Sequence, residues 1–132
     1  MDQGTLVIEE TDAGAELARE FNKYEPIKAA FWVKASDEGQ RYLYLASDRI
    51  DDSNFDVGYG EVLRLAEELQ SPYLDPFRVK LINAADPLAR AAVDIHLRFP
   101  GRMGIRFGGK SFGGMNVDDV YIYPSPLPSA VH

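Results

Sequence analysis

The sequence predicts an α+β fold, a two-layer sandwich in which a mixed sheet of about five strands packs against three helices that lie mainly on one face. Two observations support this fold class. Five short segments alternate apolar and polar residues, which is the pattern of strands with one buried face. Three longer segments repeat apolar residues at helical spacing, and the segments follow one another in the order αββαβαββ.

The first half of the chain contains a helix, a hairpin and a second helix. An apolar stripe at helical spacing predicts the first helix over residues 9–24, before Pro26 ends it. Alternating runs at 27–34 and 41–47 flank a short polar turn, so they are expected to form an antiparallel hairpin. A second apolar stripe predicts a helix over 53–70, which a Ser-Pro pair terminates.

The second half of the chain adds three strands and one helix. An alternating run predicts a strand over 77–83, and an Asp-Pro pair then starts a helix over 86–99. Two more strands follow at 102–107 and 117–123, on either side of the glycine-rich loop 108–114. The letters around this loop fit a phosphate-binding loop, but such a loop must lead into a helix, so a hairpin loop is the better interpretation.

These segments predict a single domain over residues 1–123 and a proline-rich tail over 124–132. Proline cannot donate a ladder hydrogen bond, so the tail is not expected inside the sheet. Crossover connections between parallel strands are right-handed in nearly all sheets. We therefore expect the strands to lie in sequence order across the sheet, with the crossover helices on one face.

Composition and charge restrict the function. The 132 residues include no cysteine, which excludes disulfides and thiolate chemistry. The net charge of −7 is unevenly distributed: 17 acids and 7 bases precede residue 77, whereas 4 acids and 7 bases occur from there on. The acidic N-terminus lacks the features of a signal peptide, and no apolar run reaches the roughly 20 residues of a membrane span. We expect a cytoplasmic protein that does not bind membranes.

One face of the predicted sheet is aromatic and basic. Each strand has one apolar face, formed by residues such as Phe31 and Leu43, which we assign together to the core. Strands buried on both faces are usually apolar throughout, so the alternation predicts a second face that is at least partly open. The binding surface predicted there, with the nearby glycine-rich loop, consists of Trp32, Tyr42, Tyr44, Arg78, Lys80, Arg102, Arg106, Lys110, Tyr121 and Tyr123.

Three interpretations of this face stay open. Tyrosine rings and long basic stems make good cross-strand pairs on a hydrated sheet without any function. The functional interpretation that we adopt is a non-catalytic domain that binds a protein partner or associates with itself as a homodimer, since Tyr, Trp and Arg are enriched at interfaces. The alternative is a binder of nucleic acid or of an anionic small ligand, in which bases stack on the rings and cations hold the phosphates.

A second alternative is a magnesium-dependent hydrolase at the loop that contains Asp48, Asp51 and Asp52. Acids that follow a strand can hold Mg²⁺ together with substrate phosphates. Acids at this position also favour the start of the next helix, and their spacing matches no calcium loop. His96 lies beside an apolar helical stripe, without a nucleophile motif near it. We therefore assign no catalytic residue, no metal ligand and no cofactor.

Three stretches of the chain resemble segments of a family of small bacterial proteins of unknown function. They are FNKYEPIKAAFWVK at residues 21–34, NFDVGYGE at residues 54–61 and DPFRVKL at residues 75–81. The resemblance covers most of the chain. It implies a bacterial source, and it implies no activity, cofactor or catalytic residue.

Overall fold

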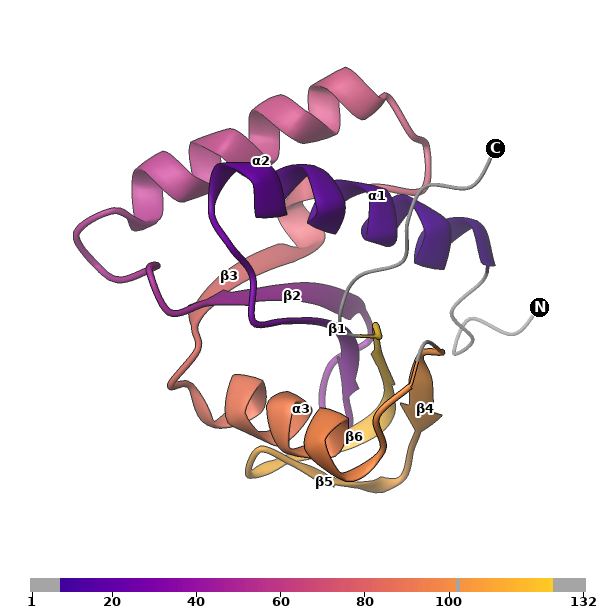
Figure 1. Cartoon of the computed structure of the whole chain (residues 1–132). Coiled ribbons are helices and arrows are strands. Elements are labelled where there is room, and N and C mark those ends of the chain that lie inside the picture. Colours follow the sequence, from indigo (N-terminus) through magenta and orange to yellow (C-terminus); the bar gives the residue numbers. More distant parts are fainter. Residues whose placement is uncertain (1–7, 102, 125–132) are drawn as a thin grey trace.

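Three helices and six strands make up the computed structural model, which describes residues 8–101 and 103–124 (Figure 1). In chain order, the elements are α1 (Ile8–Tyr24), β1 (Ala29–Ala35), β2 (Arg41–Ser47), α2 (Phe55–Leu69), the 3₁₀ turn η1 (Pro76–Arg78), β3 (Val79–Asn83), α3 (Pro87–Arg98), β4 (Ile105–Phe107), β5 (Lys110–Phe112) and β6 (Met115–Ile122). The predicted α+β fold class is confirmed, with a mixed six-stranded sheet in place of about five strands. The additional strand, β5, lies in the segment predicted as a loop.

The strands lie in the order β3-β2-β1-β6-β4 across the sheet, and β5 pairs with β6. Among the described strands, β2 and β3 are parallel and the other pairs are antiparallel. The expectation that the strands lie in sequence order is wrong. Because the eight-residue strand β6 pairs with both β1 and β4, α3 does not connect neighbouring strands but carries the chain from one edge of the sheet to the other.

Helices cover both faces of the sheet. α1 and α2 lie on one face and α3 lies on the other (Figure 1). The first core joins α1 and the sheet through residues such as Leu17 and Leu43, and the second joins α3 and the sheet through Ala92, Phe31 and Ile122. Two of the three helices therefore share a face, and the third covers the face that the alternation had left open.

The register between β1 and β2 decides which side chains share a face. Phe31 lies opposite Tyr44, and Trp32 lies opposite Leu43. Residues directly opposite each other point to the same face. The assignment of Phe31 and Leu43 to one apolar face is therefore wrong, because a shift of one residue exchanges the faces of a whole strand. Both faces of the central strands carry apolar and aromatic side chains, so both can be covered.

The glycine-rich segment folds into a tight hairpin. β5 and β6 pair antiparallel, and Gly113 and Gly114 connect them with φ values of 59° and 85°. Consecutive residues with positive φ are typical of two-residue hairpin turns and favour glycine. A Cβ atom on Gly113 would lie 2.8 Å from the Cα atom of Leu88, so the turn packs on the first turn of α3. The segment leads into a strand, which excludes the phosphate-binding loop.

The start of α3 follows the predicted pattern. The Asp86 carboxylate accepts a hydrogen bond from the Leu88 N–H at 2.9 Å, and Pro87 occupies the first helical position. These two residues fix the point at which the chain leaves the edge of the sheet and crosses its face. No helix in the described part of the chain combines the length and the apolar character needed to cross a membrane.

Candidate functional site

The structure divides the predicted aromatic and basic surface between the two faces of the sheet. Trp32 lies opposite Tyr121 and faces α1 and α2. Tyr44 lies opposite Phe31 and faces α3. Trp32 is only 4% exposed, and Tyr44 and Tyr123 are also buried. The premise that the ten residues form one accessible surface is therefore wrong, because the largest of them belong to two separate cores.

On the first face, a buried hydrogen-bonded chain ties α1 to the sheet. The Trp32 indole N–H donates to the Tyr123 hydroxyl at 2.9 Å, and this hydroxyl donates to the Thr11 carbonyl at 2.5 Å. Burial raises the pKa of the Tyr123 phenol above its ordinary value, against the opposing effect of the bond from Trp32. Gly14 of α1 permits this approach, because a Cβ there would meet both aromatic side chains. These residues stabilise the fold and cannot reach a partner.

On the second face, a lysine of β3 covers the tyrosines of β2. The Nζ atom of Lys80 lies 4.3 Å from the centre of the Tyr42 ring and 5.7 Å from that of Tyr44. Tyr44 in turn stacks on Phe31, with ring centres 5.3 Å apart and an interplanar angle of 7°. Burial raises the pKa of the Tyr44 phenol, and the nearby ammonium of Lys80 opposes this shift. The cation therefore serves to cover rings that already pack in the core.

The other predicted basic residues have structural contacts or lie outside the description. Arg106 lies over the ring of Tyr121 at 5.8 Å, and its Nε atom is 3.8 Å from the Asp119 carboxylate. The Arg78 Nε atom lies 3.8 Å from the carboxylate of Asp75. Arg102 and the side chain of Lys110 fall outside the described part of the structure.

The predicted acidic cluster does not converge. Asp48 faces Lys28 at 3.9 Å, whereas Asp51 accepts hydrogen bonds from the N–H and the hydroxyl of Ser53 at 2.8 and 2.5 Å. The Ser53 bonds lower the pKa of the Asp51 carboxyl. Among the described residues, no three histidine or acidic side chains gather as metal ligands. Asp51 therefore organises the loop before α2.

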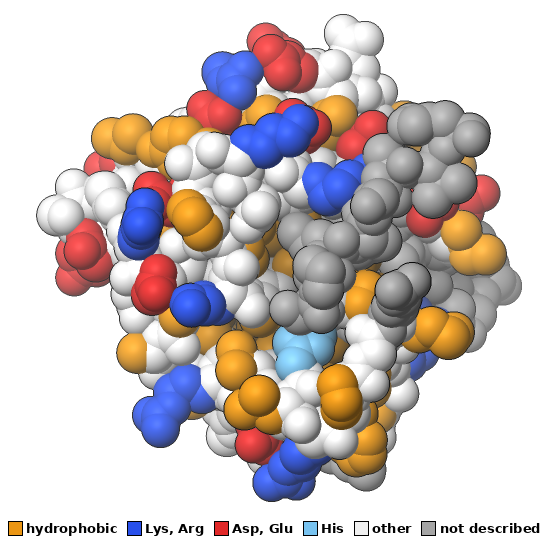
Figure 2. Space-filling model, in the orientation of Figure 1, with side chains coloured by type: hydrophobic (Ala, Val, Ile, Leu, Met, Phe, Trp, Pro, Cys, Tyr) orange, Lys and Arg blue, Asp and Glu red, His pale blue; other side chains and the backbone are white. Residues whose placement is uncertain are grey.

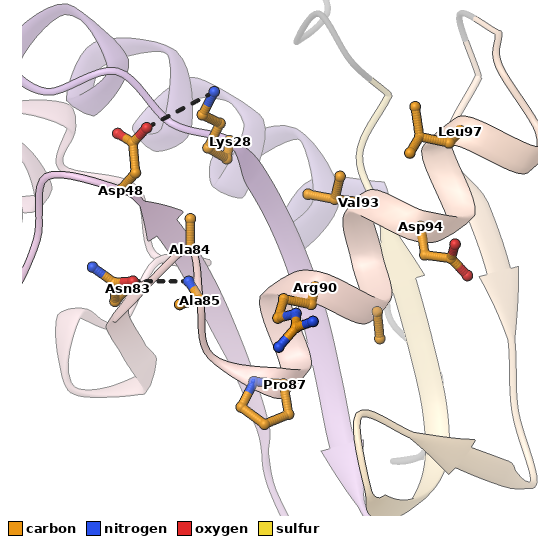
Figure 3. Close-up of a pocket in the computed structure, with 11 residues that line it drawn as sticks. Lys28, Asp48, Asn83, Ala84, Ala85, Pro87, Arg90, Val93, Asp94 and Leu97 are labelled. Carbon is orange, nitrogen blue, oxygen red and sulfur yellow. Dashed lines mark hydrogen bonds and ion pairs between the residues drawn. The ribbon is translucent and has the colours of Figure 1, made fainter.

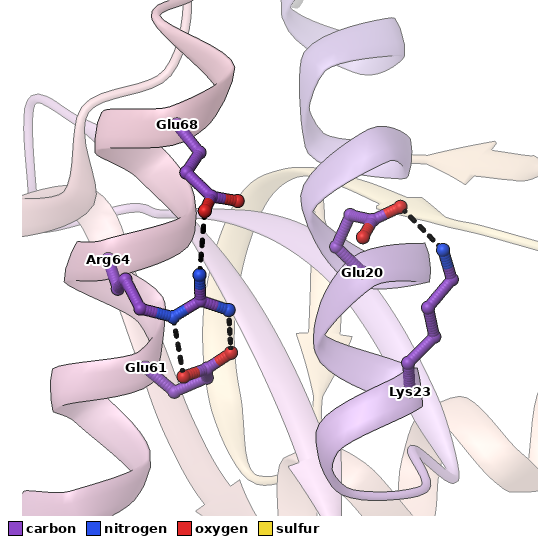
Figure 4. A network of polar contacts seen from close by, with 5 residues as sticks. All are labelled: Glu20, Lys23, Glu61, Arg64 and Glu68. Carbon is purple, nitrogen blue, oxygen red and sulfur yellow. Dashed lines mark hydrogen bonds and ion pairs between the residues drawn. The ribbon is translucent and has the colours of Figure 1, made fainter.

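The outer surface of α1 and α2 carries paired charges, beside exposed apolar side chains such as Ile8 and Val57. Arg64 bridges Glu61 and Glu68 with bonds of 2.5 and 2.8 Å, and Lys23 pairs with Glu20 at 2.9 Å (Figure 4). All of these partners lie three or four residues apart on their own helix, where side chains are neighbours. This surface has the character of a hydrated helix exterior.

The end of α3 has the opposite character, and sequence reasoning missed it. Three large apolar side chains are exposed within seven residues: Leu97 at 77%, Phe99 at 64% and Met103 at 83%. We call these three residues the apolar end of α3. Phe99 continues the helical stripe of the sequence, which predicts it inside, but α3 ends at Arg98 and Phe99 turns outward. In Figure 2, hydrophobic side chains gather in the lower part of the view, where Figure 1 places α3.

A groove adjoins the apolar end on the side of β4 and β5. This hairpin groove has a volume of about 520 Å³. Its apolar walls consist of Ala91, Ile95, Phe99, Ile105, Phe107 and Phe112. The ion pair between Asp94 and Arg98, at 3.1 Å, borders it. An apolar floor with a polar rim is the usual anatomy of a protein interface.

A second groove lies on the other side of α3, where the parallel strands β2 and β3 end. This edge groove has a volume of about 1010 Å³ and is lined by both charged and apolar residues (Figure 3). Asp48, which follows β2, and Asn83, the last residue of β3, both line this groove, as expected for neighbouring strand ends at the same edge of a sheet. The Asn83 amide bonds the Ile50 carbonyl and the Ala85 N–H, so it shapes the corner. Arg90 projects into the groove without an acidic partner among the described residues.

Comparison of the chain with models of protein families, with curated proteins and with solved structures found no match. The resemblance to small bacterial proteins therefore stays a prediction, and function has to be argued from the geometry of this chain.

Proposed function

We propose that the protein is a non-catalytic protein-binding domain whose partner contacts the apolar end of α3 and the hairpin groove beside it. The observation that carries the proposal is the exposure of Leu97, Phe99 and Met103 within seven residues, where Phe99 also lines the hairpin groove and Leu97 lines the edge groove. Contiguous exposed apolar patches on a folded domain mark interaction sites. Methionine and aromatic residues are also enriched where proteins meet.

Protein binding is the function that the sequence predicts, but the surface proposed here is the end of α3 and not a face of the sheet. Tryptophan and tyrosine on the sheet were expected to contact the partner, but they pack under the helices. The apolar residues at the end of α3 have no such cover among the described residues. An apolar side chain of a partner could enter the hairpin groove, while the Asp94–Arg98 pair offers polar contacts at its rim.

The experiment compares two substitutions of equal chemistry on opposite sides of the molecule. Phe99→Glu places a charge in the hairpin groove, and Val57→Glu places one on α2, where Val57 is 66% exposed. Both positions are exposed, so both variants should keep the melting temperature of the wild type to within a few degrees. A purified partner that binds the wild type and Val57→Glu should bind Phe99→Glu at least tenfold more weakly. Equal binding by all three proteins would contradict the proposal.

A second candidate function, binding of an anionic small ligand, is favoured by Arg90 in the edge groove. Its guanidinium has no acidic partner among the described residues, and Lys28 lines the same groove. Planar guanidinium groups bind carboxylates and phosphates through paired hydrogen bonds. Titration with pyrophosphate should shift the amide resonances of residues 83–91, and Arg90→Gln should abolish the shifts. If the wild type shows no shifts at low salt, or if Arg90→Gln shows the same shifts as the wild type, this candidate is excluded.

A further inference from the structure

The outer edge of β3 carries backbone groups without a partner. β3 lies at the end of the sheet and pairs with β2. The Ala84 N–H donates to the Ser47 carbonyl at the end of β2, at 3.0 Å, so the backbone groups of Ala84 point toward β2. Successive residues of a strand turn their N–H and C=O groups to opposite edges. Those of Val79, Leu81 and Asn83 therefore point outward.

Local hydrogen bonds use two of these outward groups. The Val79 N–H donates to the Pro76 carbonyl, and the Asn83 carbonyl accepts from the Asp86 N–H at 2.9 Å. No bond within the described residues reaches the others, which are the C=O of Val79, both groups of Leu81 and the N–H of Asn83. Acceptors and donors alternate along this edge, which is the pattern to which a further strand adds.

We infer that β3 pairs antiparallel with β3 of a second copy of the chain, about a two-fold axis at Leu81. In this register, the Leu81 N–H donates to the Leu81 carbonyl of the second copy and receives the reciprocal bond. The Asn83 N–H donates to the Val79 carbonyl of the second copy, and symmetry repeats this bond. All the groups left without a partner in one copy are then satisfied, and the two groups bonded locally, Val79 N–H and Asn83 C=O, face each other.

This self-complementarity is the reason to name a second copy as the occupant. A two-fold interface requires that one surface match itself, and the edge of β3 does so at each group that is free. The side chains are also compatible with this pairing. Lys80 would lie opposite Ile82 of the second copy, so that no like charges oppose each other across the strands.

The charge that would normally protect such an edge is turned away from it. A lysine on an edge strand commonly prevents pairing with another chain. Here the Lys80 ammonium lies over the rings of Tyr42 and Tyr44 on β2, within its own sheet. The inference shares with the proposed function the premise that this protein associates with protein, but it concerns a different surface.

Two charge substitutions at Ile82 test the pairing with the full chain. Ile82 is half-buried on β3, and both charges cost the monomer similar packing. Ile82→Lys would place a lysine opposite Lys80 of the second copy, whereas Ile82→Glu would place a carboxylate there. Sedimentation equilibrium should show a dimer whose dissociation constant is roughly tenfold larger in Ile82→Lys than in Ile82→Glu.

Amide hydrogen exchange locates the interface independently of any variant. On raising the protein concentration through the dissociation constant, exchange should slow at the Leu81 and Asn83 amides. The Lys80 and Ile82 amides, which point toward β2, serve as internal controls. A protein that is monomeric at all concentrations, or a Leu81 amide that exchanges at a concentration-independent rate, would overturn the inference. A dimer that Phe99→Glu dissociates and Ile82→Lys does not would also overturn it, while supporting the apolar end of α3 as the binding surface.

Discussion

The two faces of the sheet are covered by helical layers of different character. The layer of α1 and α2 is joined to the sheet by the bonds between Trp32, Tyr123 and Thr11, and its exterior carries paired charges (Figure 4). The α3 layer is a single twelve-residue helix, and its end leaves large apolar side chains outside. Exposed apolar area of this kind adds nothing to the stability of a monomer. Both layers pack a buried core against the sheet, and they differ in the three large apolar side chains that the end of α3 leaves exposed.

The largest effect should come from an aromatic residue buried under the layer of α1 and α2. Trp32→Ala removes a side chain that is 4% exposed, together with its bond to Tyr123, and should lower the free energy of unfolding by about 3–5 kcal/mol. Leu97→Ala, at the apolar end of α3, should change it by less than about 0.5 kcal/mol. Urea denaturation measures both variants. Similar losses at the two sites would contradict the division between the layers.

A smaller effect is expected where the β5–β6 hairpin meets α3. Gly113→Ala places a methyl group against Leu88 at a left-handed position, and should destabilise the protein by about 2–3 kcal/mol. Gly114→Ala is the matched control, because its φ is also positive but open space surrounds it. It should cost about 1 kcal/mol. Thermal unfolding of the two variants should show the difference, and equal melting temperatures would mean that the turn does not pack on α3.

The ion pairs on α2 should contribute little, and salt should reduce the contribution further. Arg64→Gln removes the ion pairs with both Glu61 and Glu68, but the Arg64 side chain is exposed to solvent. Exposed pairs of this kind are weak and screened. The melting temperature should drop slightly at low ionic strength and match the wild type in high salt. A large drop that persists in high salt would show that this surface packs against something.

The smallest effect concerns the only described histidine, His96 on α3. Burial lowers the pKa of its imidazole, so the unfolded chain binds the proton more readily than the folded protein. Stability should therefore decrease as the pH falls below the ordinary pKa of histidine, about 6.5. The decrease between pH 7.5 and pH 5 should be smaller in His96→Gln than in the wild type. Urea denaturation at both pH values checks this, and an identical pH dependence would contradict it.

The fold class could be predicted from the sequence because it depends on local patterns. The Asp86-Pro87 start of α3 and the alternation on either side of the β1–β2 turn both reflect interactions within a few residues. The strand order could not be predicted from the sequence, because it depends on the pairing of β6 with β1, which lie more than eighty residues apart. Local alternation contains no information about that choice.

The prediction that the aromatic and basic residues share one accessible face was wrong for a related reason. Trp32 and Tyr44 stand between apolar residues in the sequence, and this pattern is the same whether the second face is hydrated or covered by a helix. The apolar end of α3 did leave a signal. Leu97 lies outside the inner stripe of α3, close to the residue that ends the helix, and the helical pattern does not explain it. Met103 belongs to the alternating run that predicts a strand over 102–107, but β4 begins only at Ile105, so Met103 stays exposed.

Site-specific photo-cross-linking in the cells that produce the protein would show whether a partner contacts the apolar end of α3. A benzophenone amino acid would replace Leu97 at the apolar end of α3 in one protein, and Val57 on α2 in another; both positions are well exposed. We expect a discrete cross-linked species of higher mass from position 97 and little or none from position 57. No adduct at position 97, or the same adducts at both positions, would contradict the assignment of the α3 layer as the contact surface.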